Sequence, residues 1–264
     1  MRVSVVISTY NSQDIIEECL LNLAKCHHVY PDMEIIVVDN YSTDKTAKIA
    51  WELADVVYFK GSERTAQANY GVKMSTGEVI YLTGSDMTRD FTFILEGVMR
   101  IQEGYDAIYM SVLTDSRVNH FWGRVKALER ETYIGTFIES ARFFKKDVWE
   151  ELGGFDENMI GLEEDFQHRL DYHGYRTGRI HAREYHLHED DSLKKIFRKA
   201  FYYGKFMRSY LKSHPKRGYK QLSPFRPNLC KFLKHPILLG GFIIYKIVQY
   251  AGGVGGLLCN STEK

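Results

Sequence analysis

Val3-Ser-Val-Val-Ile-Ser8 and Glu34-Ile-Ile-Val-Val38 are two short runs rich in β-branched residues, and they decide the fold. Runs of this kind are typical of parallel strands that are buried on both faces. The segment between them, Gln13 to Cys26, carries apolar residues at helical spacing. A strand, a helix and a second strand in this order predict an α/β fold.

The same alternation continues along the first half of the chain. The predicted elements are a helix capped by Ser42-Thr43-Asp44 and reaching Leu53, a strand at Val56–Phe59, a helix at Ala66–Met74, a strand at Glu78–Leu82, a helix at Phe91–Gln102 and a strand at Ala107–Val112. They predict a sandwich with a mainly parallel central sheet. Ligands of such sheets bind at the carboxyl ends of the strands. We therefore expect the site at the turns Thr9–Asn11, Asp39–Tyr41 and Gly84–Asp86.

The second half is less regular. We expect a strand at Arg142–Phe144, a turn at Gly153-Gly154, a helix over Glu163–Tyr172 closed by Gly174, and a strand at Ala182–Tyr185. The predicted organisation is a catalytic domain at residues 1–191, with halves at about 1–112 and 113–191, followed by a C-terminal region at 192–264.

Charge divides the chain at the same place. The 264 residues have a formal net charge of +1 and are 44% hydrophobic, which excludes a disordered chain. However, Ser192 to Thr262 contains fourteen Lys or Arg residues and no Asp or Glu, and the remainder is acidic. A basic segment of this kind needs an anionic partner, either nucleic acid or a membrane. We see no nucleic-acid-binding module, so we predict no nucleic acid partner.

The C-terminal region reads as a membrane-associating segment. Ser192 to Lys212 predicts a basic amphipathic helix, and Pro236 to Leu258 is a run of 23 residues in which only Lys246 and Gln249 are strongly polar. That length would cross a hydrocarbon core of roughly 30 Å. An interfacial helix pair or an ordinary buried helix are the alternatives. The basic residues before the run favour the cytoplasmic side, and Cys19, Cys26, Cys230 and Cys259, which form no Cys-x-x-Cys pair, fit reduced thiols there.

Two carboxylates follow predicted strands. Asp86 comes after Val79–Leu82 and Gly84-Ser85, a position that suits a divalent cation on phosphate oxygens. The alternative is a turn aspartate that caps the helix near Phe91. Asp39 ends the second strand and could accept hydrogen bonds from a ribose or a base, or could cap the next helix.

These motifs together resemble the family 2 glycosyltransferases of the GT-A fold. The resemblance covers about residues 1–190 and rests on Ser8-Thr9-Tyr10-Asn11, Val37 to Thr46, Asn69 with Gly77-Glu78, Asp86, and Gly153-Gly154-Phe155-Asp156-Glu157. It implies a Rossmann-like GT-A sandwich and transfer of a sugar from a UDP- or GDP-sugar to a lipid-linked or glycan acceptor, with inversion, at the cytoplasmic face of the cell membrane.

The resemblance also implies roles for individual residues. Thr9, Asn11 and Asp39 would hold the nucleoside, and Arg64 would contact the same donor. Ser8, Asn69 and Ser85 would also line the donor site. Asp86 matches the last carboxylate of the Asp-x-Asp motif, which binds Mn²⁺ or Mg²⁺ on the diphosphate. Gly84 replaces the first aspartate of that motif, which leaves one carboxylate to hold the metal.

The acidic run Glu163-Glu164-Asp165 stands where the family places its catalytic base. Identity of the Glu-Asp pair favours Asp165, and the spacing back from Arg169-Leu170 favours Glu163. We predict Asp165. A carboxylate in this position would take the proton of the acceptor hydroxyl. The alternative is that the run only stabilises the first turn of a helix.

Two histidines follow the predicted strand at Ala182–Tyr185. His188 precedes Glu189, and the resemblance makes it a further metal ligand, whereas a solvent-facing pair of His186 and His188 is the alternative. Two other functions stay open. One is an inactive transferase-like binding protein, which Gly84 favours. The other is a sugar nucleotidyltransferase, against which the turn Thr9-Tyr10-Asn11-Ser12 argues because it lacks a Gly-rich basic loop.

Overall fold

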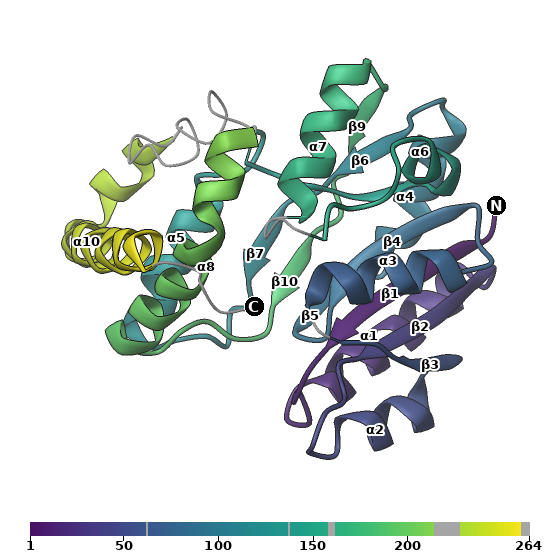
Figure 1. Ribbon diagram of the computed structural model, residues 1–264, viewed down its shortest axis with the longest axis horizontal. Helices are drawn as coiled ribbons and strands as arrows, with labels where there is room; N and C mark the ends of the chain where they lie inside the picture. The colour runs from purple at the N-terminus through teal and green to yellow at the C-terminus, as the bar shows by residue number, and fades with distance from the viewer. Residues whose placement is uncertain (62, 137, 158–161, 214–227, 260–264) are drawn as a thin grey trace. The chain divides into compact units, whose positions relative to one another are not determined.

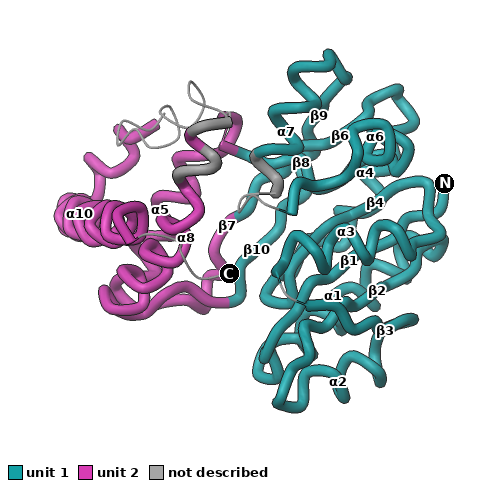
Figure 2. Tube along the Cα trace, viewed as in Figure 1, with its two compact units in different colours: residues 1–112, 139–157, 161–187 teal, residues 113–138, 158–160, 188–264 magenta. Residues whose placement is uncertain are grey.

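The computed structural model describes residues 1–61, 63–136, 138–157, 162–213 and 228–259, without the side chains of 162–164, 208–210, 212 and 213 (Figure 1). The chain divides into two compact units (Figure 2). Of the described residues, unit 1 contains 1–112, 139–157 and 162–187, and unit 2 contains 113–138 and 188–259. The sequence analysis assigned 113–138 to the catalytic domain, whereas in the structure this segment packs with the C-terminal helices.

A seven-stranded sheet forms the centre of unit 1, in the order β3-β2-β1-β4-β8-β6-β9. Its strands are β1 (Val3–Thr9), β2 (Met33–Asp39), β3 (Val56–Phe59), β4 (Val79–Gly84), β6 (Ala107–Tyr109), β8 (Ala141–Lys145) and β9 (Thr177–Arg179). The pairs β1–β2, β1–β4, β2–β3 and β6–β9 are parallel, and β8 runs antiparallel to both β4 and β6. The prediction of a mainly parallel sheet is confirmed.

Helices cover both faces of this sheet, because alternate residues of β1 belong to two cores. Val3, Val5 and Ile7 pack in the first core and Val6 packs in the second. The first core includes residues of α1 (Ile16–Val29), α2 (Thr46–Leu53) and α4 (Phe93–Gln102), and the second includes residues of α3 (Arg64–Met74), α6 (Lys146–Glu151) and α7 (Leu162–His173). This arrangement leaves the carboxyl ends of β1, β2 and β4 at one edge.

The predicted strand at Ala107–Val112 is two strands in the structure. β6 ends at Tyr109, where its register with β8 shifts, and β7 (Val112–Thr114) begins at the end of unit 1. Between them, the Ser111 carbonyl accepts a hydrogen bond from the Glu184 amide at 3.1 Å. The chain therefore leaves the main sheet here, which periodicity could not show because both strands are equally apolar.

The predicted strand at Ala182–Tyr185 overlaps β10 (Glu184–His186), whereas β5 (Met87–Arg89) and its antiparallel pairing were not predicted. β5 pairs with β10, and Met87 lies opposite His186. The predicted turn at Gly153-Gly154 is present, with φ of +77° and +79°, and Gly174 closes α7 at φ +76°. Backbone in this left-handed region favours glycine.

Unit 2 is helical. It consists mainly of α5 (Phe121–Glu131), α8 (Leu193–Ser213), the 3-10 helix η1 (Leu229–Lys234) and α10 (Pro236–Leu258). Its core is formed by Val125, Leu128, Ile196, Phe232, Phe242 and Tyr245. A Cβ on Gly252 would lie 2.6 Å from the Phe197 carbonyl oxygen, so α10 and α8 approach at backbone distance. α10 is one continuous helix and not a helix pair, and by length and composition it could cross a membrane.

Candidate functional site

Three buried polar side chains lie at the carboxyl ends of β1 and β2. Ser8 and Thr9 end β1, and Thr9 lies opposite Asp39 in the β1–β2 register. Their exposed fractions are 7%, 3% and 0%. Within the described part of the chain, Ser8 Oγ, Thr9 Oγ1 and Asp39 Oδ2 have no hydrogen-bond partner. A buried polar atom without a partner costs about 1–3 kcal/mol, so three together indicate a site that a ligand completes.

Asp39 does not cap the following helix. Its Oδ1 accepts the Ser42 backbone N–H at 2.6 Å, whereas the cap of α2 comes from Asp44, whose Oδ1 accepts the Thr46 N–H at 2.9 Å. One oxygen of Asp39 therefore fixes the loop after β2, and the other, Oδ2, has no hydrogen-bond partner among the described residues. This geometry favours the ligand-binding interpretation of Asp39 over the capping one.

Gln67 on α3 holds the ends of both strands, and the sequence analysis did not single it out. Its Nε2 donates to the Thr9 carbonyl at 2.9 Å and to the Val38 carbonyl at 2.7 Å, and the side chain is buried. A buried amide that bridges two strands fixes the distance between Thr9 and Asp39. A polar residue on the inner face of a predicted helix was the available signal.

Asn11 and Tyr41 lie in the left-handed region, with φ of +47° and +55°. The Asn11 Oδ1 accepts the Thr43 backbone N–H at 2.9 Å, so this residue ties the loop after β1 to the loop after β2. Tyr41 is 63% exposed and its ring lies 5.9 Å from that of Phe59, between centroids. Strained backbone of this kind persists mainly at functional sites. The exposed rings provide an apolar surface beside Asp39.

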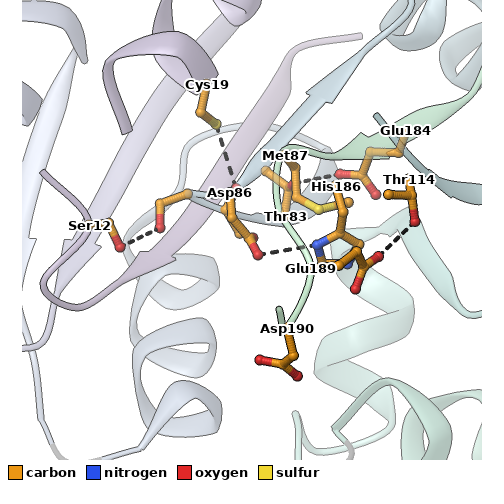
Figure 3. Close-up of polar contacts among 12 residues, drawn as sticks. Ser12, Cys19, Thr83, Asp86, Met87, Thr114, Glu184, His186, Glu189 and Asp190 are labelled. Carbon is orange, nitrogen blue, oxygen red and sulfur yellow. Dashed lines mark hydrogen bonds and ion pairs between the residues drawn. The ribbon is translucent and has the colours of Figure 1, made fainter. Parts of the chain in front are cut away.

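Asp86 follows β4, the strand that pairs with β1, and it faces His186 at the end of β10 (Figure 3). Its Oδ2 lies 3.2 Å from Nδ1 of His186. The β5–β10 pairing and a hydrogen bond from the Leu187 N–H to the Asp86 carbonyl, at 2.9 Å, hold the two side chains together. The helix α4 has Thr92 at its N-cap, so Asp86 is not a capping residue. Ser85 Oγ donates to Ser12 Oγ at 2.9 Å.

The glycine at position 84 is explained by the same geometry. A Cβ there would lie 2.8 Å from Asp86 Oδ1, closer than real Cβ atoms approach an oxygen. An aspartate at position 84 would therefore displace the Asp86 carboxylate. Asp86 takes its position because residue 84 has no side chain.

A carboxylate and an imidazole fit a divalent cation such as Mn²⁺, which accepts both oxygen and nitrogen ligands. Among the described residues, no cluster of three or more His, Cys, Asp or Glu side chains could hold a metal. The chain thus offers Asp86 and His186, and a diphosphate would supply further oxygens. His188 was the predicted ligand. It belongs to unit 2, whereas the histidine that the structure brings to Asp86 is His186.

A buried carboxylate, Glu184, lies next to the Asp86–His186 pair on the same strand as His186. Glu184 is fully buried and accepts hydrogen bonds from Tyr81, Thr83 and, at 3.2 Å, Arg142. Burial raises the pKa of Tyr81 well above its ordinary value, so the phenol stays protonated and donates to Glu184. Since Glu184 and His186 share β10, this network fixes the strand that carries the histidine.

The acidic run opens α7, and the structure describes one of its three side chains. Asp165 is 4% exposed, and its Oδ2 accepts hydrogen bonds from Arg169 Nε at 2.9 Å and forms an ion pair with Arg169 Nη2 at 2.7 Å. The predicted base is therefore already bound to a guanidinium. The side chains of Glu163 and Glu164 lie outside the described residues.

The two remaining predicted donor-binding residues differ in their surroundings. Asn69 donates to the Phe155 carbonyl at 2.9 Å and to Glu157 at 2.8 Å, and its Oδ1 accepts the Phe155 N–H at 2.9 Å. Both atoms of the amide thus hold the turn after Gly154 against α3, which is a structural role. Arg64 is exposed at the first residue of α3.

Known proteins share this sequence pattern in part. Staphylococcus aureus TarS, a poly(ribitol-phosphate) beta-N-acetylglucosaminyltransferase, is 32% identical over 93 residues, which are 33% of this chain and 16% of TarS. The beta-monoglucosyldiacylglycerol synthase of Nostoc sp. is 24% identical over 190 residues, 64% of this chain and 41% of that protein. The chain therefore spans less than half the length of either relative.

Solved structures share the fold. The mannosyltransferase PcManGT from Pyrobaculum calidifontis, in complex with GDP-Man and Mn²⁺, superimposes with a TM-score of 0.59 at 19% identity, over 98% of this chain and 76% of its own. A TarS fragment in complex with UDP-GlcNAc gives 0.56 at 18% identity, over 78% and 66%. These similarities confirm the predicted GT-A fold. The model of glycosyl transferase family 2 matches residues 4–170, more than half of the sequence, and the chain belongs to this family.

Proposed function

We propose that the chain transfers a sugar from a nucleotide-sugar donor, a UDP- or GDP-sugar, to a lipid-linked or glycan acceptor with inversion. The observation that carries this proposal is that unpartnered atoms of Ser8, Thr9 and Asp39 lie at the ends of β1 and β2, and that the Asp86–His186 pair follows the adjacent strand β4. β1 pairs with both β2 and β4, and Ser8 lies opposite Gly84. A nucleoside site and a diphosphate site thus adjoin along one sheet edge.

The nucleoside half uses groups of both hydrogen-bonding kinds. The hydroxyls of Ser8 and Thr9 can donate or accept, and Asp39 Oδ2 accepts. A ribose hydroxyl or a base N–H would satisfy these atoms and remove the cost of leaving them buried. The exposed Tyr41 and Phe59 rings offer an apolar wall for the flat base.

The diphosphate half would hold Mn²⁺ or Mg²⁺ through Asp86 and His186. When bound, the cation neutralises the negative charge that develops on the leaving diphosphate. The buried network around Glu184 orients His186 for this task, as groups behind metal-ligating histidines commonly do. His188 remains an alternative ligand.

The acidic run of α7 would supply the base. A carboxylate takes the proton from the acceptor hydroxyl, whose oxygen forms a bond to the anomeric carbon while the bond to the diphosphate breaks on the opposite face. Asp165 is the predicted residue. Because it accepts hydrogen bonds from Arg169, it would have to loosen this ion pair as it takes the proton. Glu163 and Glu164 are the alternatives.

The C-terminal region supports the proposed acceptor and site of action. α10 is apolar, and α8 carries exposed lysines. These features support attachment to the cytoplasmic face of the cell membrane, where lipid-linked acceptors are found. One relative of the family is a glucosyldiacylglycerol synthase by name, which agrees with a lipid acceptor.

The proposal is tested by equilibrium binding and turnover with a panel of UDP- and GDP-sugars, with and without Mn²⁺. For Asp86→Ala and His186→Ala we expect the Mn²⁺-dependent part of donor affinity to fall by about 10–100-fold, the loss typical of groups that hold or orient a metal. Glu52→Gln, an exposed carboxylate on α2, is the matched control and should behave as wild type.

The outcomes separate the alternatives. Failure of the unaltered chain to bind any donor would refute the proposed function. Donor binding without turnover, equal in all variants, would instead support the inactive binding protein. Formation of a nucleotide-sugar from a sugar phosphate would identify a nucleotidyltransferase. Wild-type Mn²⁺ dependence in Asp86→Ala would remove the metal assignment alone.

A further inference from the structure

α10 presents two faces of opposite character. Its buried residues are Gly241, Phe242, Tyr245, Lys246, Gly252 and Gly256. Its exposed large residues are all aliphatic, namely Ile237, Ile243, Ile244, Ile247, Val254 and Leu258. Lys246 is the only charged residue of the helix, and it lies on the buried face.

A buried ion network anchors this inner face to α5. Lys246 forms an ion pair with Glu129 and donates to Gln249 at 2.8 Å. Glu129 is 1% exposed and also pairs with Lys126 at 2.8 Å and accepts from the Tyr133 hydroxyl. Withdrawing α10 from unit 2 would leave these buried charges without their partners, which is strongly unfavourable. It would also place Lys246 in hydrocarbon if the helix crossed a bilayer.

The elements that pack against α10 expose basic and aromatic residues. Leu233 and Lys234 of η1 are exposed immediately before Ile237, which is 78% exposed. The helix α8, which packs along α10, exposes Lys194, Arg198 and Lys205 together with Phe197, Tyr202 and Tyr203. An aliphatic face with cationic and aromatic neighbours complements an anionic lipid surface.

We propose that α10 lies in the plane of an anionic phospholipid bilayer, embedded by its Ile237–Leu258 face, and does not cross it. The inner face stays in contact with unit 2, and the ion network of Glu129, Lys126 and Lys246 remains intact. This inference rests on the membrane attachment in the proposed function and adds the orientation of the helix.

Two exposed cysteines report that orientation. Cys230 lies in η1 before α10, and Cys259 follows the last residue of the helix. They stay on one side of the membrane if α10 lies in the plane, and on opposite sides if α10 crosses. Cys19 and Cys26 are buried, and burial raises the pKa of both thiols, so they react slowly.

The experiment uses the full chain with Cys230→Ser or Cys259→Ser, so that each variant keeps one exposed thiol. Inside-out membrane vesicles of the expressing bacterium are treated with a membrane-impermeant maleimide, before and after detergent. We expect both variants to co-sediment with the vesicles and to label equally in closed vesicles. Labelling of one thiol only after detergent would establish a spanning helix and overturn the proposal. Absence of the chain from the vesicles would overturn it as well.

The embedding face is tested with added liposomes. Ile244→Glu and Ile247→Glu, at positions 48% and 62% exposed, should weaken binding to phosphatidylglycerol-containing vesicles by at least about tenfold. Leu21→Glu, at a 46% exposed position on α1, is the matched control and should bind as wild type. Wild-type binding by Ile244→Glu would refute this face. Donor binding, measured in the same variants, should be unchanged, which separates failure of this inference from failure of the proposed function.

Discussion

The two units depart from ideal packing in opposite ways. Unit 1 buries polar atoms of Ser8, Thr9 and Asp39 that have no partner among the described residues. Unit 2 satisfies its buried charges, with Glu129 between Lys126 and Lys246, but exposes a row of aliphatic side chains on α10. Both departures cost free energy in the isolated chain. In each unit, the unfavourable group therefore indicates the kind of partner. Unpartnered polar atoms in unit 1 indicate a small polar ligand, and exposed aliphatic side chains in unit 2 indicate an extended apolar surface.

The largest expected effect comes from breaking the satisfied network of unit 2. Glu129→Gln leaves the buried Lys246 and the partly buried Lys126 without a counter-charge, and we expect a loss of about 3–5 kcal/mol in the free energy of unfolding. The measurement is the urea midpoint of the full chain. As a control, Asp191→Asn removes an exposed pair with Lys195 and should leave the urea midpoint nearly unchanged.

The same network predicts a pH dependence. Burial alone disfavours the charged carboxylate, but Lys126 and Lys246 hold the pKa of Glu129 well below its ordinary value. A depressed pKa stabilises the fold above the unfolded value of about 4.3, and this contribution disappears as the pH falls further. The stability difference between wild type and Glu129→Gln should therefore narrow below about pH 4. A difference that grows at low pH would contradict the network.

A second effect concerns the base on α7. If Asp165 is the base, Asp165→Asn should lower kcat by about 100-fold or more with little change in the donor KM. Arg169→Gln is the informative partner, because it removes the same ion pair and keeps the carboxylate. If Asp165→Asn and Arg169→Gln lose the same stability, and if both lower kcat only slightly and by the same factor, then Asp165 has a structural role and is not the base. Glu163→Gln and Glu164→Gln should then reveal which carboxylate takes the proton.

The smallest expected effect on stability concerns Thr9, one of the unpartnered residues of unit 1. Thr9→Val removes an unpartnered buried hydroxyl, so the unfolding free energy should stay within about 1 kcal/mol of wild type or rise. Donor affinity should nevertheless fall several-fold. Thr46→Val is the matched control, because Thr46 is equally buried but its hydroxyl accepts the Ser12 N–H at 2.7 Å. That variant should lose about 1 kcal/mol. A destabilised Thr9→Val would mean that the Thr9 hydroxyl has a partner.

Much of unit 1 could be predicted because its local signals agree. The β-branched runs at β1 and β2 are too apolar for any element but a buried strand, and a carboxylate directly after such a strand must lie at the sheet edge. Asp39 and Asp86 were found in this way. The grouping of segment 113–138 with α8 and α10 could not be predicted, because these helices follow much later in the chain.

The finer site could not be predicted because it depends on pairing between distant segments. His186 and His188 are equivalent as sequence, and only the β5–β10 register, with Met87 opposite His186, brings one of them to Asp86. Gln67 donates to two backbone carbonyls, and contacts with the backbone leave no motif in the sequence. The charge of Lys246 within an apolar helix is explained by its ion pair with Glu129, which is remote in the sequence.

The backbone contact between α8 and α10 has a consequence for how this sequence can vary over evolution. A Cβ at Gly252 would collide with the Phe197 carbonyl oxygen, whereas the isoleucines of the outer row are exposed. Substitutions among Ile, Leu, Val and Met should therefore accumulate freely along the outer row of α10. The buried glycines of the inner face, Gly241, Gly252 and Gly256, should stay invariant. The two rows of one helix would then change at different rates. The slow row would be constrained by the packing of α10 on α8, and the fast row only by the need for hydrophobic side chains.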